Sequence, residues 1–381
     1  MRVLVLGCGK IGSVIARDLA ETAASTEITI ADKHRREAKN VGAALSKENV
    51  SQIQIDVADY CRLVRIMKRF DLVVGALPGG VGYQAAKACI DAKVNMVDVS
   101  YMPQNPLELN ADAVEAGLII VPDCGVAPGL SNMLVGHSVS KLDQIESVHI
   151  MVGGLPQEPV PPLNYTITWS VDDLIDEYTR KVTIVENGKI VEVEALSGLE
   201  SIEFPHVGKL EAFYTDGLRT LIHTLKVAKS MWEKTVRYPG HVEKIRLLKD
   251  LGLFDEESIE VEKLRVSPRK VTIKLLEKKL CRPEIKDVLA MKVETVGIKE
   301  NSKRVYAYYL LDYYDEKHGI AAMARTTAYT ASIVAQLLIQ KVIRGKGVIP
   351  PESVVAEEEI FNKILAELKK RQIKIVASKS I

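Results

Sequence analysis

Short apolar runs alternate with amphipathic stretches along the first 125 residues of this chain. Residues 3–6 form an apolar run that predicts a buried strand, and residues 13–21 have the spacing of a helix. The alternation continues, with strands expected at 27–31, 50–57, 71–76, 95–99 and 118–121 and helices at 59–70 and 83–92. Strands that alternate with helices in this way predict a doubly wound parallel sheet.

After residue 130 the pattern changes, and strands follow one another with fewer helices between them. We expect strands at 149–153, 164–169, 183–185, 189–191, 271–276, 289–298 and 305–314, and helices at 171–181, 218–231 and 242–251. Residues 186–188 are a hairpin signal, and residues 155–162 are a proline-rich loop. These elements predict an α+β domain built on a mostly antiparallel sheet.

The C-terminal part predicts a long apolar helix at 326–343 and a charged amphipathic helix at 357–374. The fold class is therefore α/β, a Rossmann-type sheet with a second α+β domain. We expect a Rossmann-type domain at 1–130, a second domain at 131–322, and C-terminal helices at 323–381 that return to the first domain. The long apolar helix needs a partner surface, so we expect a homodimer or larger homo-oligomer.

Composition narrows the classes of partner. A formal net charge of +1 gives no reason to expect nucleic acid, and no apolar stretch approaches the roughly 20 residues that span a bilayer. The five cysteines are scattered without a C-x-x-C pair, which is typical of reduced thiols and predicts neither disulfides nor a metal site. Since the first strand starts at the N-terminus, we expect no signal peptide and a cytoplasmic protein.

The turn after the first strand has the spacing G-x-G-x-x-G over residues 7–12. In a dinucleotide site Gly7 permits the tight turn, Gly9 lets the pyrophosphate approach the backbone, and Gly12 lets helix and strand pack closely. Lys10 and Ile11 open the helix, whose first N–H groups attract phosphate. A glycine-rich turn without a ligand is the alternative.

Asp32 stands at the end of the second predicted strand, twenty residues after the last glycine. A carboxylate there accepts the ribose hydroxyls and repels a 2′-phosphate, which favours NAD. The bases at 33–36 leave NADP as an alternative. At the end of the third strand, Asp56 with Val57 either contacts the adenine or caps a helix.

In such a sheet, ligands bind outside the carboxyl ends of the strands. We therefore expect the cofactor to contact the residues that follow three further strands, namely Ala76, Leu77, Pro78, Val99, Ser100, Ala127 and Pro128. Asp98, Tyr101 and Asp123 are the catalytic candidates, because carboxylates in a cleft have raised pKa values that suit proton transfer. The alternative for each aspartate, Asp98 and Asp123, is that it caps a following helix. For Cys124 we favour a small core residue over a nucleophile.

The chain resembles the saccharopine dehydrogenase-like family. The resemblance rests on the glycine fingerprint and on segments 98–101, 123–129, 153–156, 169–170 and 233–241, the last of them similar to a T-x-R-Y-x-G motif of the family. Length and the second-domain segments are most similar to the L-lysine 6-dehydrogenases, and the loop 157–162 departs from that of the saccharopine-forming members.

This resemblance implies an NAD-dependent oxidoreductase that acts on a lysine-like amine. It further implies that residues 1–130 are the NAD-binding domain and that residues 131–322 are a substrate and dimerisation domain. Lysine would need an anchor for its carboxylate, for which Arg237 is the first candidate with Arg180 and Arg219 in reserve. Further candidates for contact with the amino-acid substrate are Tyr238, His241, Trp169 and Thr215. For these the alternatives are a helix start at His241, aromatic core packing at Trp169, and a helix N-cap at Thr215.

Two other functions remain open at this point. One is reductive condensation of an amine with an oxo-acid or aldehyde, of the saccharopine or carboxyspermidine type, which shares the hydride step. The other is a regulatory protein that binds NAD without turnover. Oxidation of the lysine ε-amine to the 6-semialdehyde with release of ammonia is the function that the sequence favours.

Overall fold

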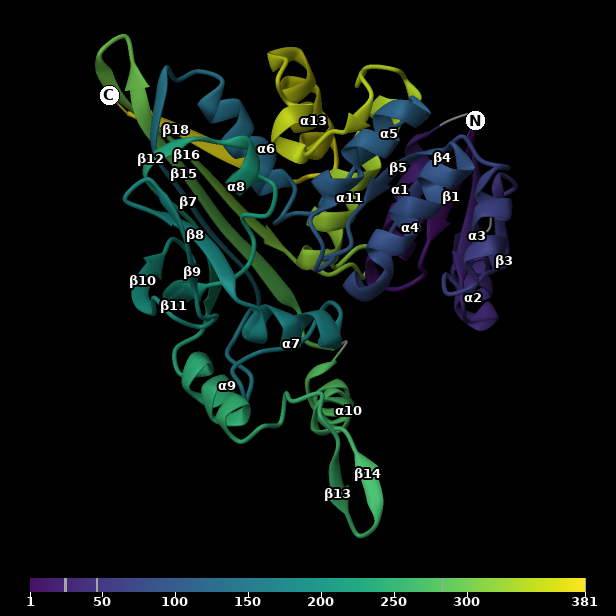
Figure 1. The fold of residues 1–381 in the computed structure, drawn as a ribbon, viewed down its shortest axis with the longest axis horizontal. Helices are drawn as coiled ribbons and strands as arrows, with labels where there is room; N and C mark the ends of the chain where they lie inside the picture. The colour runs from purple at the N-terminus through teal and green to yellow at the C-terminus, as the bar shows by residue number, and fades with distance from the viewer. Residues whose placement is uncertain (24–25, 46, 283, 381) are drawn as a thin grey trace. The chain divides into compact units, whose positions relative to one another are not determined.

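A computed structural model describes residues 1–23, 26–45, 47–282 and 284–380 of the 381-residue chain. The chain divides into two compact units. Unit 1 comprises residues 1–141, 219–224 and 324–374, and unit 2 comprises residues 142–218, 225–323 and 375–381. The short segment 219–224 is thus part of unit 1, although the chain on both sides of it belongs to unit 2. Figure 1 labels the helices and strands along the chain.

Unit 1 is built on a parallel sheet with helices on its faces. The strand order is β17-β6-β5-β4-β1-β2-β3, and every pairing in it is parallel, which confirms the predicted Rossmann-type sheet. Its elements are β1 (Arg2–Leu6), α1 (Lys10–Thr22), β2 (Glu27–Asp32), α2 (Arg35–Leu45), β3 (Val50–Gln54), α3 (Tyr60–Met67), β4 (Leu72–Gly75), α4 (Gly79–Ala92), β5 (Asn95–Asp98), the 3-10 helix η1 (Pro106–Leu109), α5 (Asn110–Ala116), β6 (Ile119–Val121), α6 (Leu130–Val139), α8 (Leu221–Thr224), α11 (Ala322–Ile339), β17 (Gly347–Val348), α12 (Pro351–Val354) and α13 (Glu358–Lys370).

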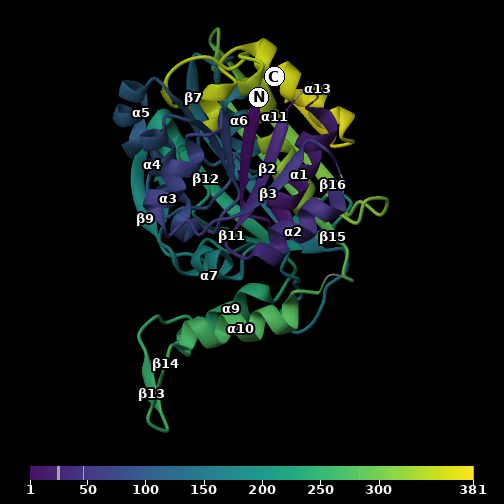
Figure 2. The same cartoon turned by 90° about the vertical axis from the view of Figure 1, so that its right-hand side faces the viewer.

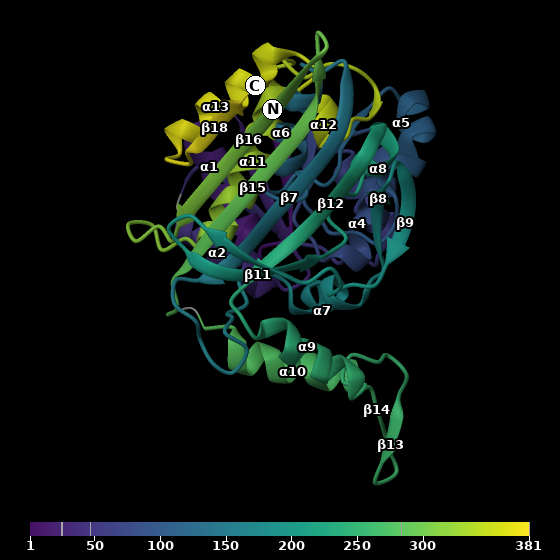
Figure 3. The same ribbon diagram turned by 90° about the vertical axis from the view of Figure 1, so that its left-hand side faces the viewer.

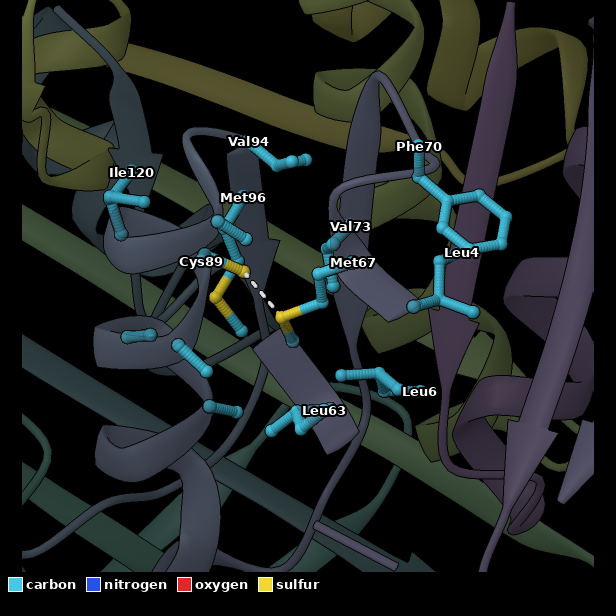
Figure 4. Close-up of a cluster of buried hydrophobic side chains, with 14 of the residues drawn as sticks. Leu4, Leu6, Leu63, Met67, Phe70, Val73, Cys89, Val94, Met96 and Ile120 are labelled. Atoms are coloured by element: carbon cyan, nitrogen blue, oxygen red, sulfur yellow. Dashed lines mark hydrogen bonds between the residues drawn. The ribbon is translucent and has the colours of Figure 1, made fainter. Parts of the chain in front are cut away.

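The core on one face of this sheet is formed by strand side chains and by helices α3, α4 and α5 (Figure 4). Leu4, Leu6 and Val73 project from the strands against Leu63 and Met67 of α3. Helix α4 contributes mainly alanines, whose small side chains let a helix lie close to a sheet. This core fixes the helices α3, α4 and α5 against one face of the sheet.

The C-terminal helices are joined to α1 through one buried carboxylate. Asp18 of α1 accepts from Arg371 at 2.8 and 2.9 Å and from Ser332 of α11 at 2.6 Å. Both partners of the ion pair have side chains less than a tenth exposed, so removal of either would leave a buried charge without its counterpart. Helices from the two ends of the chain are thereby fixed to each other.

Unit 2 is built on a mixed, mostly antiparallel sheet (Figures 2 and 3). The order is β10-β11-β12-β7-β15-β16-β18, with β8 paired to β12 and to β9, and only β7 and β12 run parallel among these pairs of described strands. Its elements are β7 (Gln144–Pro156), α7 (Val171–Thr179), β8 (Val182–Glu186), β9 (Lys189–Val193), β10 (Glu200–Phe204), β11 (Gly208–Tyr214), β12 (Val227–Arg237), α9 (His241–Asp250), β13 (Ile259–Val261), β14 (Leu264–Val266), α10 (Pro268–Leu280), β15 (Asp287–Lys299), β16 (Ser302–Tyr313) and β18 (Ile375–Ser380).

Three element predictions in this unit are wrong. Within residues 218–231 only 221–224 are helical (α8), and 227–231 belong to strand β12, which pairs with β7, β8 and β11. Residues 271–276 lie inside helix α10, because Ser267 caps it and Pro268 opens it, and these signals outweigh the β-branched run. Residues 164–169 are not a strand and their burial does not alternate: Tyr165, Thr166 and Ile167 are all buried, and the backbone N–H of Ile167 donates to the carbonyl of Leu280.

Every helix in the described part of the chain is too short or too polar to traverse a lipid bilayer. The described residues also contain no group of three His, Cys, Asp or Glu side chains placed to hold a metal ion.

Candidate active site

The turn between β1 and α1 has the geometry that its glycines predict. Gly7 has a φ of +94°, and a Cβ on it would lie 2.3 Å from the carbonyl oxygen of Ala76. A Cβ on Gly12 would lie 1.9 Å from the carbonyl oxygen of Gly7. Around Gly9, in contrast, a Cβ would meet no described atom within 4 Å. Gly7 and Gly12 are thus needed for packing, and Gly9 leaves the backbone open to a ligand.

Helix α1 begins directly after this open position. Its N-cap is Gly9, which provides no side-chain cap, and no acidic residue lies in its first turn. Backbone N–H groups in the first turn of a helix have no partner within the helix and bind phosphate well. A pyrophosphate therefore fits here by both shape and charge.

Asp32 is tied to the glycine turn at the end of β2. Its Oδ2 accepts from the backbone N–H of Cys8 at 2.9 Å, and its Oδ1 accepts from the backbone N–H of His34 at 2.8 Å. Each carboxylate oxygen has two acceptor sites, so capacity for two ribose hydroxyls remains. The residues that fit a dinucleotide are thus Gly7, Gly9 and Gly12 with Asp32.

The other predicted cofactor residues follow the ends of neighbouring parallel strands. Asp56 and Val57 follow β3, Ala76, Leu77 and Pro78 follow β4, Val99 and Ser100 follow β5, and Ala127 and Pro128 lie in the loop between β6 and α6. Asp56 accepts from the backbone N–H of Ala58 in a local turn, and α3 is capped by Asp59 instead. Asp56 is therefore not the cap of that helix.

Asp98, the last residue of β5, is completely buried. Its two oxygens accept from the backbone N–H of Ser100 at 3.0 Å and from the Ser100 hydroxyl at 2.9 Å. Burial raises the pKa of Asp98 to about 7, the nearby charge of Asp123 adds to the rise, and the bonds from Ser100 oppose it. Asp98 can therefore take or release a proton near neutral pH.

Asp123 differs from Asp98 in having a cationic partner. The guanidinium of Arg219 donates to it at 3.2 and 3.4 Å, and both side chains are almost fully buried. Both residues have left-handed backbone conformations, with φ values of +49° and +52°. Such conformations cost about 1–3 kcal/mol each in residues other than glycine and are found most often at functional sites.

Two further predicted residues lie close to this ion pair. The Arg219 guanidinium carbon lies 5.6 Å from the centre of the Tyr101 ring, within the range of a cation–π contact. Cys124 is fully buried, and burial raises the pKa of its thiol further above neutrality, which confirms a core residue in place of a nucleophile.

Segment 219–224 is anchored in unit 1 by a second carboxylate. Glu352 of α12 accepts from the hydroxyl of Thr220 at 3.0 Å and from that of Thr224 at 2.7 Å. Burial raises the pKa of Glu352, and the charge of Asp123 adds to the rise. These bonds hold the segment, and with it Arg219, at the carboxyl side of the sheet.

Unit 2 contains a separate buried polar cluster around Arg237. The guanidinium donates to Glu177 of α7 at 3.3 Å and lies over the Tyr165 ring at 4.5 Å. Its Nε is buried and has no hydrogen-bond partner among the described residues. Burial opposes the charge of Arg237, but Tyr165, Tyr178 and Glu177 outweigh it and its pKa lies above the ordinary arginine value.

Two of the remaining substrate candidates, His241 and Tyr238, have hydrogen-bond partners within unit 2. His241 is the first residue of α9, and its Nδ1 and Nε2 contact the Leu163 carbonyl at 2.8 Å and the Tyr178 hydroxyl at 2.9 Å. Burial lowers the pKa of His241 to about 3, so its ring is neutral. Tyr238 donates to the Pro156 carbonyl at 3.0 Å.

Thr215 and Trp169 also have partners within unit 2. The expected helix at Thr215 is wrong, because the described chain there leaves β11 in a turn. The Thr215 hydroxyl bonds to that of Thr235 at 2.9 Å, and Thr235 in turn donates to Glu177. The Trp169 indole donates to the Tyr165 hydroxyl at 3.2 Å.

Sequence reasoning missed two residues that organise these clusters. Glu177 lies in a helix that was predicted correctly, and its burial at 8% was the missing information. Glu352 lies in the short helix α12, directly after Pro351, in a part of the chain where the sequence indicated no candidate site residue. In neither case does a local motif distinguish the carboxylate from an exposed surface charge.

Comparison with known proteins gives the family. A model described as the saccharopine dehydrogenase C-terminal domain matches residues 125–373, and one described as the saccharopine dehydrogenase NADP binding domain matches residues 3–121. The chain belongs to the saccharopine dehydrogenase family. The predicted family is confirmed, and the first 121 residues contain an NAD(P)-binding domain.

The curated relatives that the chain matches are named after different reactions. The chain is 25% identical to the mitochondrial alpha-aminoadipic semialdehyde synthase of Bos taurus, with 100% of this chain and 48% of that protein aligned. It is 22% identical to the carboxyaminopropylagmatine dehydrogenase of Synechocystis sp., with 93% and 92% aligned. The chain thus spans about half the length of the semialdehyde synthases that it matches.

A solved structure shows the same fold. The apo form of saccharopine dehydrogenase (L-Glu forming) from Saccharomyces cerevisiae aligns over 100% of both chains with a TM-score of 0.81 and 18% sequence identity. At this identity the likeness establishes the fold of the saccharopine dehydrogenase family for this chain.

Proposed function

We propose that this protein is an NAD-dependent dehydrogenase that oxidises the ε-amine of L-lysine. The observation that carries the proposal is the buried Asp98, whose pKa of about 7 provides a proton acceptor at the carboxyl edge of a dinucleotide-binding sheet. The support for lysine is the resemblance in length and second-domain segments. Family membership supports dehydrogenase chemistry in general.

The overall reaction converts a protonated primary amine, an oxidised dinucleotide and water into an aldehyde, the reduced dinucleotide, ammonium and a proton. When bound, the nicotinamide accepts the hydride that leaves C6 with its electron pair. The amine must be neutral at that step, although its usual pKa is near 10.4. Asp98 would accept the amine proton and release it to solvent, because its pKa lies near the working pH.

Asp123 and Arg219 have a supporting role in this proposal. Arg219 gives Asp123 a counter-charge through two hydrogen bonds, whereas Asp98 receives hydrogen bonds only from Ser100 within the described part of the chain. The two aspartates thus have different electrostatic surroundings, and of the two we propose Asp98 as the proton acceptor. Tyr101 lies against Arg219 and would help to orient it.

Arg237 is the proposed anchor for the substrate carboxylate. Its buried Nε–H has no partner among the described residues, and a buried donor without an acceptor costs about 1–3 kcal/mol. A carboxylate oxygen of the substrate would satisfy this donor. For Trp169, Thr215, Tyr238 and His241 we propose that they support the cluster, since each already bonds within unit 2.

A panel of substrates tests the reaction. Purified protein is incubated with NAD and L-lysine, with formation of the reduced cofactor and of ammonia followed together. We expect equal amounts of both, and much slower turnover of L-ornithine, whose chain is one methylene shorter. Turnover only with saccharopine or a carboxyalkyl polyamine, without ammonia, would show the condensing type, which the 92% coverage of the Synechocystis relative favours.

NAD in preference to NADP is a finer proposal, which rests on Asp32. Substitution Asp32→Ala removes the carboxylate that repels a 2′-phosphate, so we expect the ratio of kcat/KM for NAD over NADP to fall at least about tenfold. Asp56→Ala, at the end of the neighbouring strand, is the matched control and should leave the ratio unchanged. An unchanged ratio in Asp32→Ala would remove this residue from cofactor selection.

A further inference from the structure

The ion pair between Arg237 and Glu177 in unit 2 is buried but loosely closed. The Arg237 side chain is 3% exposed, and that of Glu177 is 10% exposed. The Nη2 atom of Arg237 lies 3.3 Å from Oε2 and 3.5 Å from Oε1 of Glu177, whereas hydrogen bonds between such charged groups are usually about 2.7–2.9 Å long. The contact therefore does little to offset the cost of burying the two charges.

Both groups of this pair can make further hydrogen bonds. The Nε–H of Arg237 is buried and has no acceptor among the described residues. On Glu177, the long contact with Nη2 is the only hydrogen bond of Oε2 within the described chain, and a carboxylate oxygen accepts two. The pair thus offers one donor and one acceptor, and a ligand that satisfies both must itself carry an acceptor and a donor.

The carboxylate and the guanidinium are each held in place from the side. Thr235 donates to Oε1 of Glu177, and a hydroxyl has only one proton, so Thr215 must be the donor in its 2.9 Å bond with Thr235. On the other side of the pair, Nη1 of Arg237 donates to the Val236 carbonyl at 3.0 Å. A ligand would therefore meet two charged groups whose positions are already fixed, which lowers the entropy that binding costs.

A zwitterionic amino acid has the chemistry that this pair requires. Its α-carboxylate supplies an acceptor for the Nε–H of Arg237, and its α-ammonium supplies donors for Oε2 of Glu177. The headgroup and the ion pair each have no net charge, so binding brings no uncompensated charge into the buried cluster. A carboxylate without an ammonium group would instead place a second anion on one guanidinium and leave Oε2 without a new donor.

We propose that Glu177 is a specificity-determining residue, which binds the α-ammonium group of the substrate while Arg237 binds the α-carboxylate. The inference rests on the proposed role of Arg237. It adds the class of substrate that the cluster selects, namely α-amino acids in preference to carboxylic acids that lack the α-amine. In this arrangement Thr215 and Thr235 keep the other oxygen of Glu177 in place.

Two ligands that cannot react at C6 as amines test this selection without turnover. L-Norleucine and hexanoate have the same carbon chain and the same carboxylate, and they differ only in the α-ammonium group. We expect calorimetry on the wild type to give a dissociation constant at least about tenfold lower for norleucine, because a hydrogen bond to a charged group contributes that much to affinity. Equal affinities, or no detectable binding of norleucine, would overturn the proposal.

Substitution Glu177→Gln tests whether this residue causes the selection. The amide oxygen can still accept from Thr235, but the negative charge is lost, so the ratio of the two dissociation constants should fall to within about threefold. A residue that only stabilises unit 2 would change both affinities equally. The matched control is Asp176→Asn, because Asp176 is the neighbouring carboxylate on α7 and pairs with Arg180 and Arg269 at 2.6 Å.

The control should keep the wild-type ratio, and thermal unfolding verifies that each variant is folded. A Glu177→Gln variant that keeps the wild-type ratio would exclude Glu177 from binding the ammonium group. Failure of the proposed reaction gives a different result from failure of this inference. Selection of norleucine by a wild type that does not oxidise lysine would retain the amino-acid site and remove the reaction. Oxidation of lysine without selection of norleucine would retain the reaction and remove the role of Glu177.

Discussion

At the scale of single residues, two buried aspartates in unit 1 have different partners. Asp123 is paired with a guanidinium, and Asp98 is buried with only the donors of Ser100 around it in the described chain. The structure thus explains why the carboxylate without a cation has the raised pKa. The same difference makes Asp98 a source of pH dependence in stability as well as in the proposed activity.

Substitution Asp98→Asn tests this pH dependence. The folded protein keeps a proton on Asp98 up to about pH 7, whereas the unfolded chain loses this proton near pH 4. The free energy of unfolding of the wild type therefore falls as the pH rises from 4 to 7, and Asp98 causes no further fall above pH 7. The amide of the variant does not titrate. Relative to the wild type, the variant should therefore gain on the order of 4 kcal/mol at most in free energy of unfolding between pH 4 and pH 8.

Urea denaturation of the wild type and of Asp98→Asn at several pH values measures the difference in free energy of unfolding. If this free energy changed with pH equally in both proteins, the prediction would be wrong. Under the proposed function, wild-type kcat/KM should also rise with pH through about 7, because the base must be ionised. Asp98→Asn should lack that rise and lose about 10²–10⁴-fold in kcat.

Arg237 provides a second residue-scale prediction. Its removal alone would leave Glu177 buried without its partner, so the informative variant is Arg237→Gln with Glu177→Gln. If Arg237 binds the substrate carboxylate, the KM for lysine should rise at least about tenfold with little change in the KM for NAD. Thermal unfolding of the double variant verifies that unit 2 remains folded. Equal changes in both KM values would assign Arg237 a structural role only.

At the scale of elements, the glycine turn separates a packing role from a binding role. Gly12→Ala places a Cβ 1.9 Å from the Gly7 carbonyl oxygen and should destabilise the fold by about 1–3 kcal/mol. Gly9→Ala meets no described atom within 4 Å, and Gly9 has a φ of −69° that alanine tolerates. It should fold normally but bind the dinucleotide at least about tenfold more weakly.

Thermal unfolding and titration with the reduced cofactor, carried out on both variants, measure the two effects. Normal cofactor affinity in Gly9→Ala would show that the pyrophosphate lies elsewhere.

The elements of unit 1 could be predicted because each carries its own signal. The apolar strands and the helix caps are local, and the parallel sheet follows from their alternation. Helix α10 was missed although two local signals mark its start, the cap Ser267 and the following Pro268. Strand β12 was missed because its tertiary neighbours decide it: Met231 is buried and pairs with both β7 and β8. Strand β18 follows a helix by four residues, and only its pairing with β16 identifies it.

In the candidate site, too, the sequence predicted the features that depend on nearby residues and missed those that depend on distant ones. Gly7, Gly9, Gly12 and Asp32 were found from spacing, since each role depends on residues nearby in the sequence. Arg219 was only a reserve candidate, because its partner Asp123 lies 96 residues away and its segment joins unit 1 from within the sequence of unit 2. Contacts of that kind are invisible to a local pattern.

At the scale of the whole molecule, the chain joins two units whose roles we propose to be complementary. Unit 1 is the NAD(P)-binding part of a saccharopine dehydrogenase family protein, and unit 2 carries the buried Arg237 cluster on a mixed sheet. The sequence crosses between the units several times, including the passage through segment 219–224. Loss of either unit should therefore abolish the proposed reaction.

The central claim is that hydride leaves C6 of L-lysine, and isotopic labelling tests it most directly. Lysine carrying deuterium at both C6 positions is incubated with the protein and NAD, and the reduced cofactor is analysed by mass spectrometry. The account predicts one deuterium in each reduced cofactor, and none when the label is at Cα. Label transferred from Cα, or reduced cofactor without deuterium from C6-labelled lysine, would contradict the account.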